Sequence, residues 1–182
     1  MKLSKSQKIQ IIENIEDKIV PKTQLLNSIR DVIHNDPSQI FNSLRRIKKI
    51  EYLFQNYYYI NSEEERVRGI KKYSMFELIA VVLNKLNIKW YFGLHTANDI
   101  NKVVWQPSKT IYIINNKFSK KIKIDNQSIH FHKMKKELIN NYQIHKTRNR
   151  IQLHISNNEK TLEDFVYLNK QPPIELKNIV EK

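Results

Sequence analysis

Amide and guanidinium side chains recur after Pro37 at the spacing of one helix face. Gln39, Asn42 and Arg46 lie three and four residues apart, and a helix with about 3.6 residues per turn brings such positions onto one side. Primary amides can pair bidentately with adenine and guanidinium groups with guanine, whereas lysine ammonium groups suit backbone phosphates. The side chains available for this chemistry are Ser38, Gln39, Asn42, Arg45, Arg46, Lys48 and Lys49.

A helix must position these side chains, and the surrounding sequence predicts one. Apolar residues fall at i, i+1, i+4 and i+7, and these are Ile40, Phe41, Leu44 and Ile47. They are expected to be buried beneath the polar stripe, on which Lys49 also falls. Asn35 or Asp36 can cap the first free N–H groups, and Pro37 has the preset φ angle of a first helical turn.

A β-hairpin is predicted directly after this helix. The runs IEYLF and YYYI are rich in aromatic and β-branched residues, and Gln55 and Asn56 separate them. Asn tolerates the positive φ angle that a tight hairpin turn requires. Two further helices are expected earlier in the chain, over residues 5–19 and 22–33. Three helices followed by a hairpin are the order of a winged helix-turn-helix, whose third helix enters the major groove while the wing lies along the phosphates. Gln55 and Asn56 at the tip of the wing are therefore also predicted to contact DNA.

The charge of the whole chain favours a polyanionic partner. The formal net charge is +14 and the isoelectric point is about 9.8, which suits nucleic acid, an anionic membrane or an acidic protein. A second interpretation stays open, because Lys, Ile and Asn are abundant everywhere, as an AT-rich genome would produce without selection for binding. The polar stripe also has an ordinary interpretation, since surface helices usually carry Arg and Lys.

Several function classes are excluded by residue types that are absent or scarce. The chain has no cysteine, so it can form neither disulfides nor a thiolate metal site. Its only glycines are Gly69 and Gly93, whereas dinucleotide fingerprints, Walker loops and nucleophile elbows each need closely spaced glycines. No segment approaches the roughly 18 apolar residues of a membrane span. We therefore expect a cytoplasmic protein that is not an enzyme and uses neither a cofactor nor a metal ion.

Two domains are expected, residues 1–70 and residues 71–182. The charged stretch NSEEERVRGIKKYS is predicted to link them, with the boundary near Lys71. The run SMFELIAVVLNKL then has the periodicity of a buried helix, and short alternating runs from Thr110 onward predict strands. A last helix over residues 160–168 precedes a tail without predicted structure. The fold class is α+β, with an N-terminal winged helix-turn-helix followed by a second, mixed α/β domain.

Basic residues are concentrated in the second domain. From Lys102 to Arg150 the chain has twelve Lys and Arg residues against two acidic ones, Asp125 and Glu137. Such a region can extend a DNA footprint, because each neutralised phosphate adds salt-dependent affinity, or it can dock an acidic protein. The predicted secondary basic patch consists of Lys117, Lys120, Lys121, Lys123, Lys133, Lys135, Lys136, Lys146, Arg148 and Arg150.

Both halves of the chain resemble the AbiEi-type antitoxins and transcriptional regulators of abortive-infection toxin–antitoxin systems. The stretch IFNSLRRIKKIEYLFQNYYYI looks like that family's recognition helix and wing. The stretches YFGLHTANDI, KTIYIINN and IQLHISNNEKTLEDFVYL look like motifs of its second domain. Two departures are Asn56, where a wing-turn glycine is usual, and Lys49-Ile50-Glu51, where a glycine usually separates helix and wing. The resemblance implies a repressor that binds its own operator in double-stranded DNA, and a second domain that counters a nucleotidyltransferase-like toxin.

Three other interpretations remain. A metal-dependent nuclease needs converging carboxylates, and only Asp125 and Glu137 are available in the basic region. A zinc site would have to draw on scattered histidines, which are His130, His132, His145 and His154. The third interpretation is a winged-helix transcription regulator with no toxin partner, whose second domain serves dimerisation or effector sensing.

Overall fold

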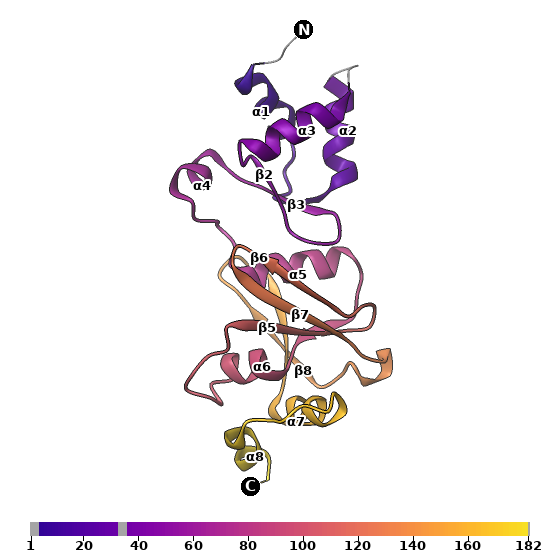
Figure 1. The fold of residues 1–182 in the computed structure, drawn as a ribbon, viewed down its shortest axis with the longest axis vertical. Coiled ribbons are helices and arrows are strands. Elements are labelled where there is room, and N and C mark those ends of the chain that lie inside the picture. The colour runs from indigo at the N-terminus through magenta and orange to yellow at the C-terminus, as the bar shows by residue number, and fades with distance from the viewer. Residues whose placement is uncertain (1–3, 33–35, 182) are drawn as a thin grey trace. The chain divides into compact units, whose positions relative to one another are not determined.

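The structure, a computed structural model, describes residues 4–32 and 36–181 and divides into two compact units. Unit 1 comprises residues 1–78 and unit 2 residues 79–182. Figure 1 shows the elements of both units. The division lies inside helix α5 (Met75–Lys85), whereas the sequence predicted a boundary near Lys71.

Unit 1 combines short helices with a three-stranded antiparallel sheet. Its helices are α1 (Lys5–Glu13), α2 (Lys22–Val32), α3 (Pro37–Arg46) and α4 (Glu63–Arg68), and α5 begins in it. Its strands are β1 (Ile19–Pro21), β2 (Ile50–Tyr52) and β3 (Tyr57–Ile60). The strand order is β1-β3-β2, so that β3 lies in the centre.

The apolar faces of the first three helices and of the sheet meet in one core. Ile12 of α1, Leu25 of α2 and Leu44 of α3 are fully buried in it. Phe41 of α3 meets Tyr58 of β3 edge to face, with the ring centroids 5.1 Å apart. Because the apolar residues of α3 recur with the helical period, burying them turns its polar residues to solvent.

Local signals account for where the helices begin and end. The Asp36 side chain accepts a hydrogen bond from the Ser38 N–H at 2.9 Å, so α3 begins at Pro37 as predicted. Asn35, the other predicted cap, lies outside the described residues. Ser62 and Glu65 form a capping box at the start of α4, and Gly69 ends that helix in the left-handed region with a φ angle of 67°.

Unit 2 is built on a six-stranded mixed sheet with the order β6-β7-β5-β4-β9-β8. The strands are β4 (Trp90–Phe92), β5 (Thr110–Asn115), β6 (Lys120–Ile124), β7 (Gln127–Lys133), β8 (Tyr142–Lys146) and β9 (Gln152–Ser156). Its helices besides α5 are α6 (Leu94–Ile100), the 3-10 turn η1 (Lys136–Leu138), α7 (Asn158–Tyr167) and α8 (Ile174–Val180). The pairs β5–β7 and β4–β9 are parallel, and β6 and β8 form the two edges.

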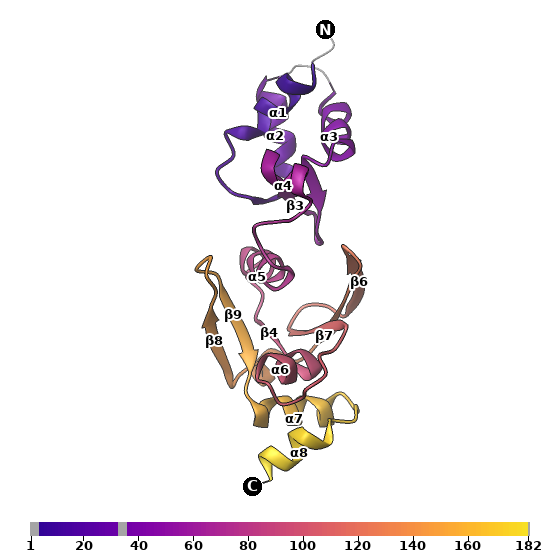
Figure 2. The same cartoon turned by 90° about the vertical axis from the view of Figure 1, so that its left-hand side faces the viewer.

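Helices cover both faces of this curved sheet. Figure 2 shows α5 on one side, and α6, α7 and α8 on the other. The Trp90 indole N–H of β4 donates to the Asn84 side chain of α5 at 2.9 Å. On the opposite face, Ile114 of β5 packs in a buried cluster with Phe165 of α7 and Leu176 of α8. The sheet is therefore the middle layer of unit 2.

The sequence predicted most of these elements, and the mixed α+β class is confirmed. The helix predicted over residues 5–19 is wrong at its end, because α1 stops at Glu13 and Ile19 and Val20 pair with β3 as a strand. Strand β8 was not predicted, and the tail, expected to lack structure, contains α8. Among the described residues, no helix is long and apolar enough to cross a membrane.

Candidate nucleic-acid interface

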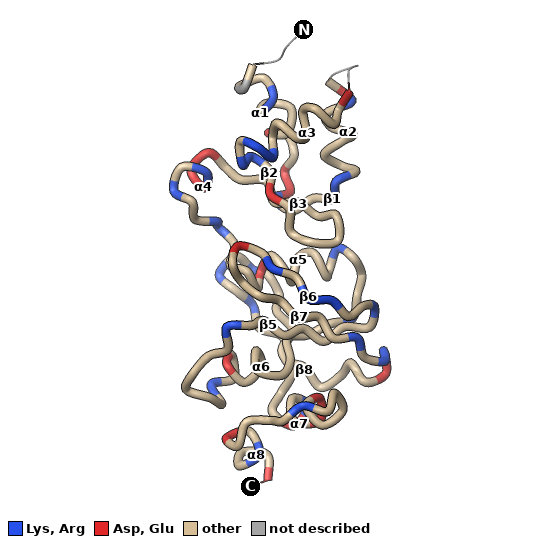
Figure 3. Tube along the Cα trace, in the orientation of Figure 1, with Lys and Arg blue, Asp and Glu red and all other residues tan. Residues whose placement is uncertain are grey.

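One face of α3 carries the side chains that the sequence singled out. Ser38, Gln39, Asn42, Arg45 and Arg46 are all exposed, whereas the opposite face of the helix is buried in the core of unit 1. The helix contains no acidic residue. In the described part of the chain, neither of its arginines forms an ion pair. Figure 3 marks these cations in blue at the C-terminal end of α3. The structure thus brings the five predicted side chains onto one open surface.

Lys48 and Lys49 have different environments although they are neighbours. Lys48 has a φ angle of 54°, and the next N–H, that of Lys49, donates to the Leu44 carbonyl at 2.9 Å. This left-handed residue ends the helix and turns the chain towards β2. Lys48 is exposed, but only 5% of Lys49 is accessible. The prediction that Lys49 lies on the exposed stripe is wrong, because the helix ends before reaching it.

Burial also changes the chemistry of Lys49. It lowers the pKa of the ammonium group, and the charge of nearby Glu13 opposes this effect. A buried lysine that is already surrounded by protein cannot reach a DNA phosphate without leaving its site. We therefore exclude Lys49 from the candidate interface and retain Lys48.

The turn after α3 is held in place by Asn61, which the sequence did not single out. Its side-chain amide donates to the Lys48 carbonyl at 2.9 Å and to the Glu51 carboxylate at 3.0 Å. Its backbone N–H donates to the Lys49 carbonyl at 2.9 Å. Lys71 then pairs with the second Glu51 oxygen at 2.6 Å. These contacts position Lys48, and no local sequence pattern predicts them because they join residues far apart in the chain.

The predicted hairpin and its turn are present. Gln55 and Asn56 have φ angles of 51° and 61°, and the Tyr57 N–H donates to the Phe54 carbonyl at 3.0 Å. Two successive positive φ angles are those of a type I′ turn. Asn56 is exposed and Gln55 half-buried. The Asn56 carbonyl accepts from the Lys22 N–H at 2.8 Å, which ties the tip of the hairpin to the start of α2.

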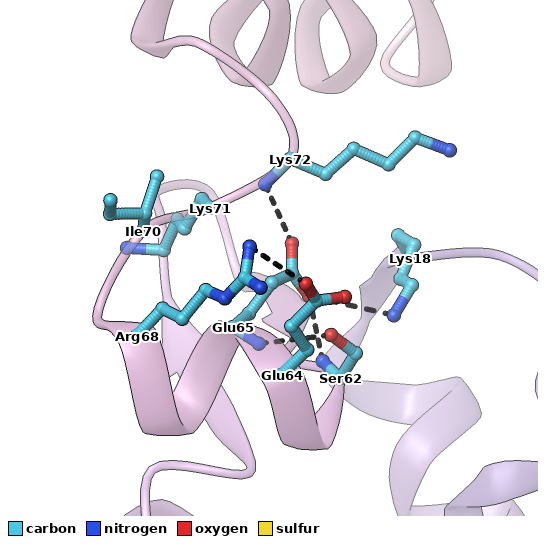
Figure 4. A pocket seen from close by; sticks show the side chains of 8 residues that line it. All are labelled: Lys18, Ser62, Glu64, Glu65, Arg68, Ile70, Lys71 and Lys72. Atoms are coloured by element: carbon cyan, nitrogen blue, oxygen red, sulfur yellow. Dashed lines mark hydrogen bonds and ion pairs between the residues drawn. The ribbon is translucent and has the colours of Figure 1, made fainter.

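A pocket of about 430 Å³ lies beside α4 in the same unit. Figure 4 shows that the Glu65 carboxylate stands within it, close to Lys18, Arg68 and Lys72. The carboxylate accepts hydrogen bonds from the Ser62 and Lys72 N–H groups, both at 2.7 Å, and from the Tyr59 hydroxyl. Because the protein's own carboxylate already holds this position, we interpret the pocket as a structural junction and not as an anion site.

Hydrogen bonding controls the ionisation of this carboxylate. Burial acts to raise the pKa of Glu65, but the hydrogen bonds from Ser62, Tyr59 and Lys72 outweigh it and lower the pKa to about 2. Glu65 is therefore ionised throughout the physiological range. It joins α4, β3 and the segment that precedes α5.

The secondary basic patch is not continuous. All ten of its side chains are exposed, but β6 and β8 are opposite edges of the sheet. Seven of them belong to the β6–β7 hairpin and its flanking segments, whereas Lys146, Arg148 and Arg150 belong to the β8–β9 hairpin. Figure 2 shows the two hairpins on either side of α5. The structure thus separates the predicted patch into two basic edges.

The histidines considered for zinc lie on three strands. His130 and His132 of β7 contact Tyr112, with centroid separations of 5.4 and 6.1 Å, and burial lowers the pKa of His132 to about 4. His154 of β9 stacks on the rings of Trp90 and Tyr142. Among the described residues, no three His, Asp or Glu side chains are grouped as metal ligands.

The two carboxylates considered for a nuclease are also apart. Asp125 precedes β7 and Glu137 follows it, so they lie at opposite ends of one seven-residue strand. No family model matches the chain, and no similar sequence was found among curated proteins.

Proposed function

We propose that the chain is a DNA-binding transcription regulator whose unit 1 acts as a winged helix-turn-helix. The observation that carries this proposal is the exposed face of α3, on which amides and guanidinium groups stand together without an acidic residue. Support also comes from the order α1-β1-α2-α3-β2-β3, which is that of a winged helix. In this arrangement α3 enters the major groove and the β2–β3 hairpin lies over the backbone.

Each side chain has a role that its chemistry suits. Gln39 and Asn42 pair with adenine, and Arg45 or Arg46 with guanine. Lys48 and the turn residue Asn56 contact backbone phosphates, with Ser38 and Gln55 as further polar contacts. The cation of Lys48 lies just beyond the helix, where a phosphate flanking the groove would be met.

We further propose that the chain represses its own operon and acts as an antitoxin against a nucleotidyltransferase-like toxin. This part rests on the resemblance to AbiEi-type regulators, in which the second domain carries the antitoxin activity. Residues 71–182 would then bind or counteract the toxin in the cytoplasm. The two basic edges of the sheet offer this domain weak, salt-dependent contacts with DNA or with an acidic surface.

A regulator without a toxin partner is the alternative. It shares all contacts proposed for α3 and differs only in what the second domain does. An adjacent gene for a nucleotidyltransferase favours the antitoxin. Co-expression of that gene with this chain should restore growth if the antitoxin role is correct, and continued growth arrest contradicts it.

DNA binding is tested with a duplex that covers the DNA directly upstream of the coding sequence. The variant Arg45→Ala, Arg46→Ala, Lys48→Ala removes three exposed cations of the proposed interface. A matched control, Arg68→Ala, Lys109→Ala, Lys177→Ala, removes three exposed cations elsewhere, so both variants have the same net charge. Fluorescence anisotropy gives the affinity of each for this duplex and for a scrambled duplex of equal length.

The two variants should behave differently. Because each base-reading Arg contributes about 1–3 kcal/mol, the interface variant should bind the upstream duplex roughly 100-fold or more weakly than the parent chain. It should also no longer prefer the upstream duplex to the scrambled duplex. The control should keep that preference. Equal losses in both variants, with the folds intact by circular dichroism, contradict the proposal, because they indicate that only net charge matters.

A further inference from the structure

A second pocket lies in unit 2, between α6, the loop that follows it and the start of α8. Its volume is about 290 Å³, and His95, Asp99, Trp105 and Glu175 contribute to its lining. None of the residues that line it is Lys or Arg. In a chain with a net charge of +14, this pocket is therefore a local site of negative charge.

Only one of the two oxygens of the Asp99 carboxylate accepts a hydrogen bond among the described residues. Its Oδ2 accepts the Ser108 N–H at 2.9 Å, but its Oδ1 is buried and has no hydrogen-bond partner among the described residues. Burial raises the pKa of Asp99, and the hydrogen bond from Ser108 and the charge of His95 offset this effect only in part. Glu175 of α8 adds an exposed carboxylate, and no ion pair in the described part of the chain involves it. A cation in this pocket would compensate the charge of both carboxylates.

Trp105 supplies an aromatic surface at the same place. Its side chain is 88% exposed, whereas the chain's other tryptophan, Trp90, is 1% exposed. An indole so exposed gains nothing from the core, but its face can attract a cation that lies over it. Burial lowers the pKa of His95, so its imidazole is neutral near pH 7 and does not repel a cation. Lys170 acts on His95 electrostatically but does not line the pocket.

We propose that this pocket binds an arginine side chain presented by a partner protein. A guanidinium group is planar, so it can stack on the Trp105 indole while its N–H groups donate to Asp99 and Glu175. The volume of about 290 Å³ lies just below the roughly 300–1,000 Å³ typical of small-molecule sites, which suits one side chain better than a larger ligand. Tryptophan and arginine are also the residues that most often dominate protein interfaces.

The pocket adds a specific binding site to the partner role proposed for residues 71–182. That the arginine belongs to a partner protein rests on this proposed role. Its test uses a small probe and no DNA, so its result is independent of the α3 experiment. Failure of the probe to bind overturns the pocket assignment and leaves the DNA proposal standing.

The probe is N-acetyl-L-arginine N-methylamide, titrated into the full chain. Its control is the citrulline analogue, which has nearly the same shape but carries no charge. The indole N–H signal of Trp105 in an NMR spectrum reports binding, and the buried Trp90 serves as internal reference. We expect saturable shifts of the Trp105 signal with the arginine probe, and no saturation with the citrulline analogue.

Variants assign the contacts. Asp99→Asn and Trp105→Ala should each weaken the arginine probe by roughly tenfold, measured for Trp105→Ala by calorimetry because it lacks the reporter. Glu159→Gln, which removes an exposed carboxylate outside the pocket, should bind the probe like the parent chain. Thermal unfolding checks that each variant is folded, and Trp105→Ala should unfold at the parental temperature because its side chain is exposed.

Three outcomes overturn the proposal. The first is equal binding of the arginine and citrulline probes, which indicates a non-ionic contact. The second is unchanged arginine binding in both Asp99→Asn and Trp105→Ala. The third is tighter binding of Mg²⁺ or spermidine than of the arginine probe, which indicates a metal or polyamine site instead.

Discussion

Two neighbouring lysines show how a single backbone angle decides what a residue can do. Lys48 adopts a left-handed conformation and stays exposed, whereas Lys49 enters the interior of unit 1. An exposed ammonium can reach a phosphate, but a buried one costs free energy unless it is compensated. The same charge is therefore accessible to a phosphate at one position and opposes stability at the next.

Lys49→Met should leave DNA affinity unchanged and keep or raise the unfolding free energy at neutral pH. Methionine has a similar length and needs no compensating charge. Because burial lowers the folded-state pKa of Lys49 below its unfolded value of 10.5, unfolding takes up a proton as the pH approaches that value. The stability of the parent chain should therefore rise, relative to the variant, between the folded-state pKa and pH 10.5. Urea unfolding across this range measures the difference.

A matched variant separates burial from charge. Lys48→Met removes an exposed ammonium, so it reports the loss of one positive charge without the loss of a buried group. A large loss of stability in Lys49→Met at neutral pH contradicts the idea that the buried charge is unfavourable.

Glu65 is the reverse case, because its charge is stabilised inside the protein. The carboxylate gains hydrogen bonds on folding that lower its pKa from 4.5 to about 2. Its contribution to stability is therefore present above pH 4.5 and is lost as the pH falls towards about 2. Glu65→Gln should destabilise unit 1 by about 1–3 kcal/mol at neutral pH, since hydrogen bonds to a charged group are lost.

The pH dependence tests this assignment. The stability difference between the parent chain and Glu65→Gln should shrink as the pH falls from 4.5 to about 2. Glu64→Gln is the control, because Glu64 is exposed and its ion pair with Arg68 is on the surface. Such pairs contribute at most about 1 kcal/mol. A constant difference for Glu65→Gln at all pH values would falsify the depressed pKa.

At the scale of elements, the β2–β3 turn determines where the hairpin tip lies. Gln55 and Asn56 both have positive φ angles. Residues other than Gly, Asn and Asp adopt such angles at a cost in conformational free energy. The Asn56 carbonyl is bonded to the start of α2, so the turn also connects the hairpin to a helix. The asparagine therefore adopts a conformation that glycine adopts without strain.

Asn56→Gly and Asn56→Ala should therefore differ in their effect on stability. Glycine adopts the left-handed region without strain and should keep stability close to that of the parent, whereas alanine should lower it by about 1 kcal/mol. Both variants remove the same side chain, so the difference isolates the backbone. Urea unfolding measures it, and equal destabilisation by both indicates that the Asn56 side chain and not its φ angle is responsible.

At the scale of the whole molecule, residues 71–73 contact earlier residues of unit 1, beyond the boundary predicted at residue 70. Lys71 pairs with Glu51, the Lys72 N–H donates to Glu65, and Tyr73 packs edge to face on Tyr59 at 6.1 Å. The next residue, Ser74, accepts the Glu77 N–H in a capping box that begins α5. A fragment that ends at Tyr73 therefore keeps these contacts and leaves helix α5 whole in the other fragment.

Fragments test this division. Residues 1–73 should fold and bind the upstream duplex, whereas residues 1–70 should be less stable because three contacts to residues 71–73 are missing. Residues 74–182 should protect cells from the toxin if the antitoxin proposal is correct, and should bind DNA only weakly and with steep salt dependence. Circular dichroism and a growth assay provide the measurements. Protection by residues 1–73 alone, or equal stability of the two shorter fragments, contradicts this division.

The amino-acid sequence by itself determined the elements whose signals are local. The apolar period of α3, its Asp36 cap and Pro37, and the Asn-containing hairpin turn were all predicted correctly because they depend on residues close together in the chain. The same holds for the amide and guanidinium side chains of α3, whose exposure follows from the helical period.

Only the tertiary structure decided what depends on residues far apart. Strand β1 exists because Ile19 and Val20 pair with Tyr59 and Tyr58, about forty residues later, and this pairing ends the helical pattern of α1 early. Sheet order separated the basic patch into two edges, and long-range packing buried Lys49. The pocket around Asp99 likewise joins α6 to α8. Local propensity amounts to a fraction of a kcal/mol per residue, so burial and strand pairing override it wherever the two compete.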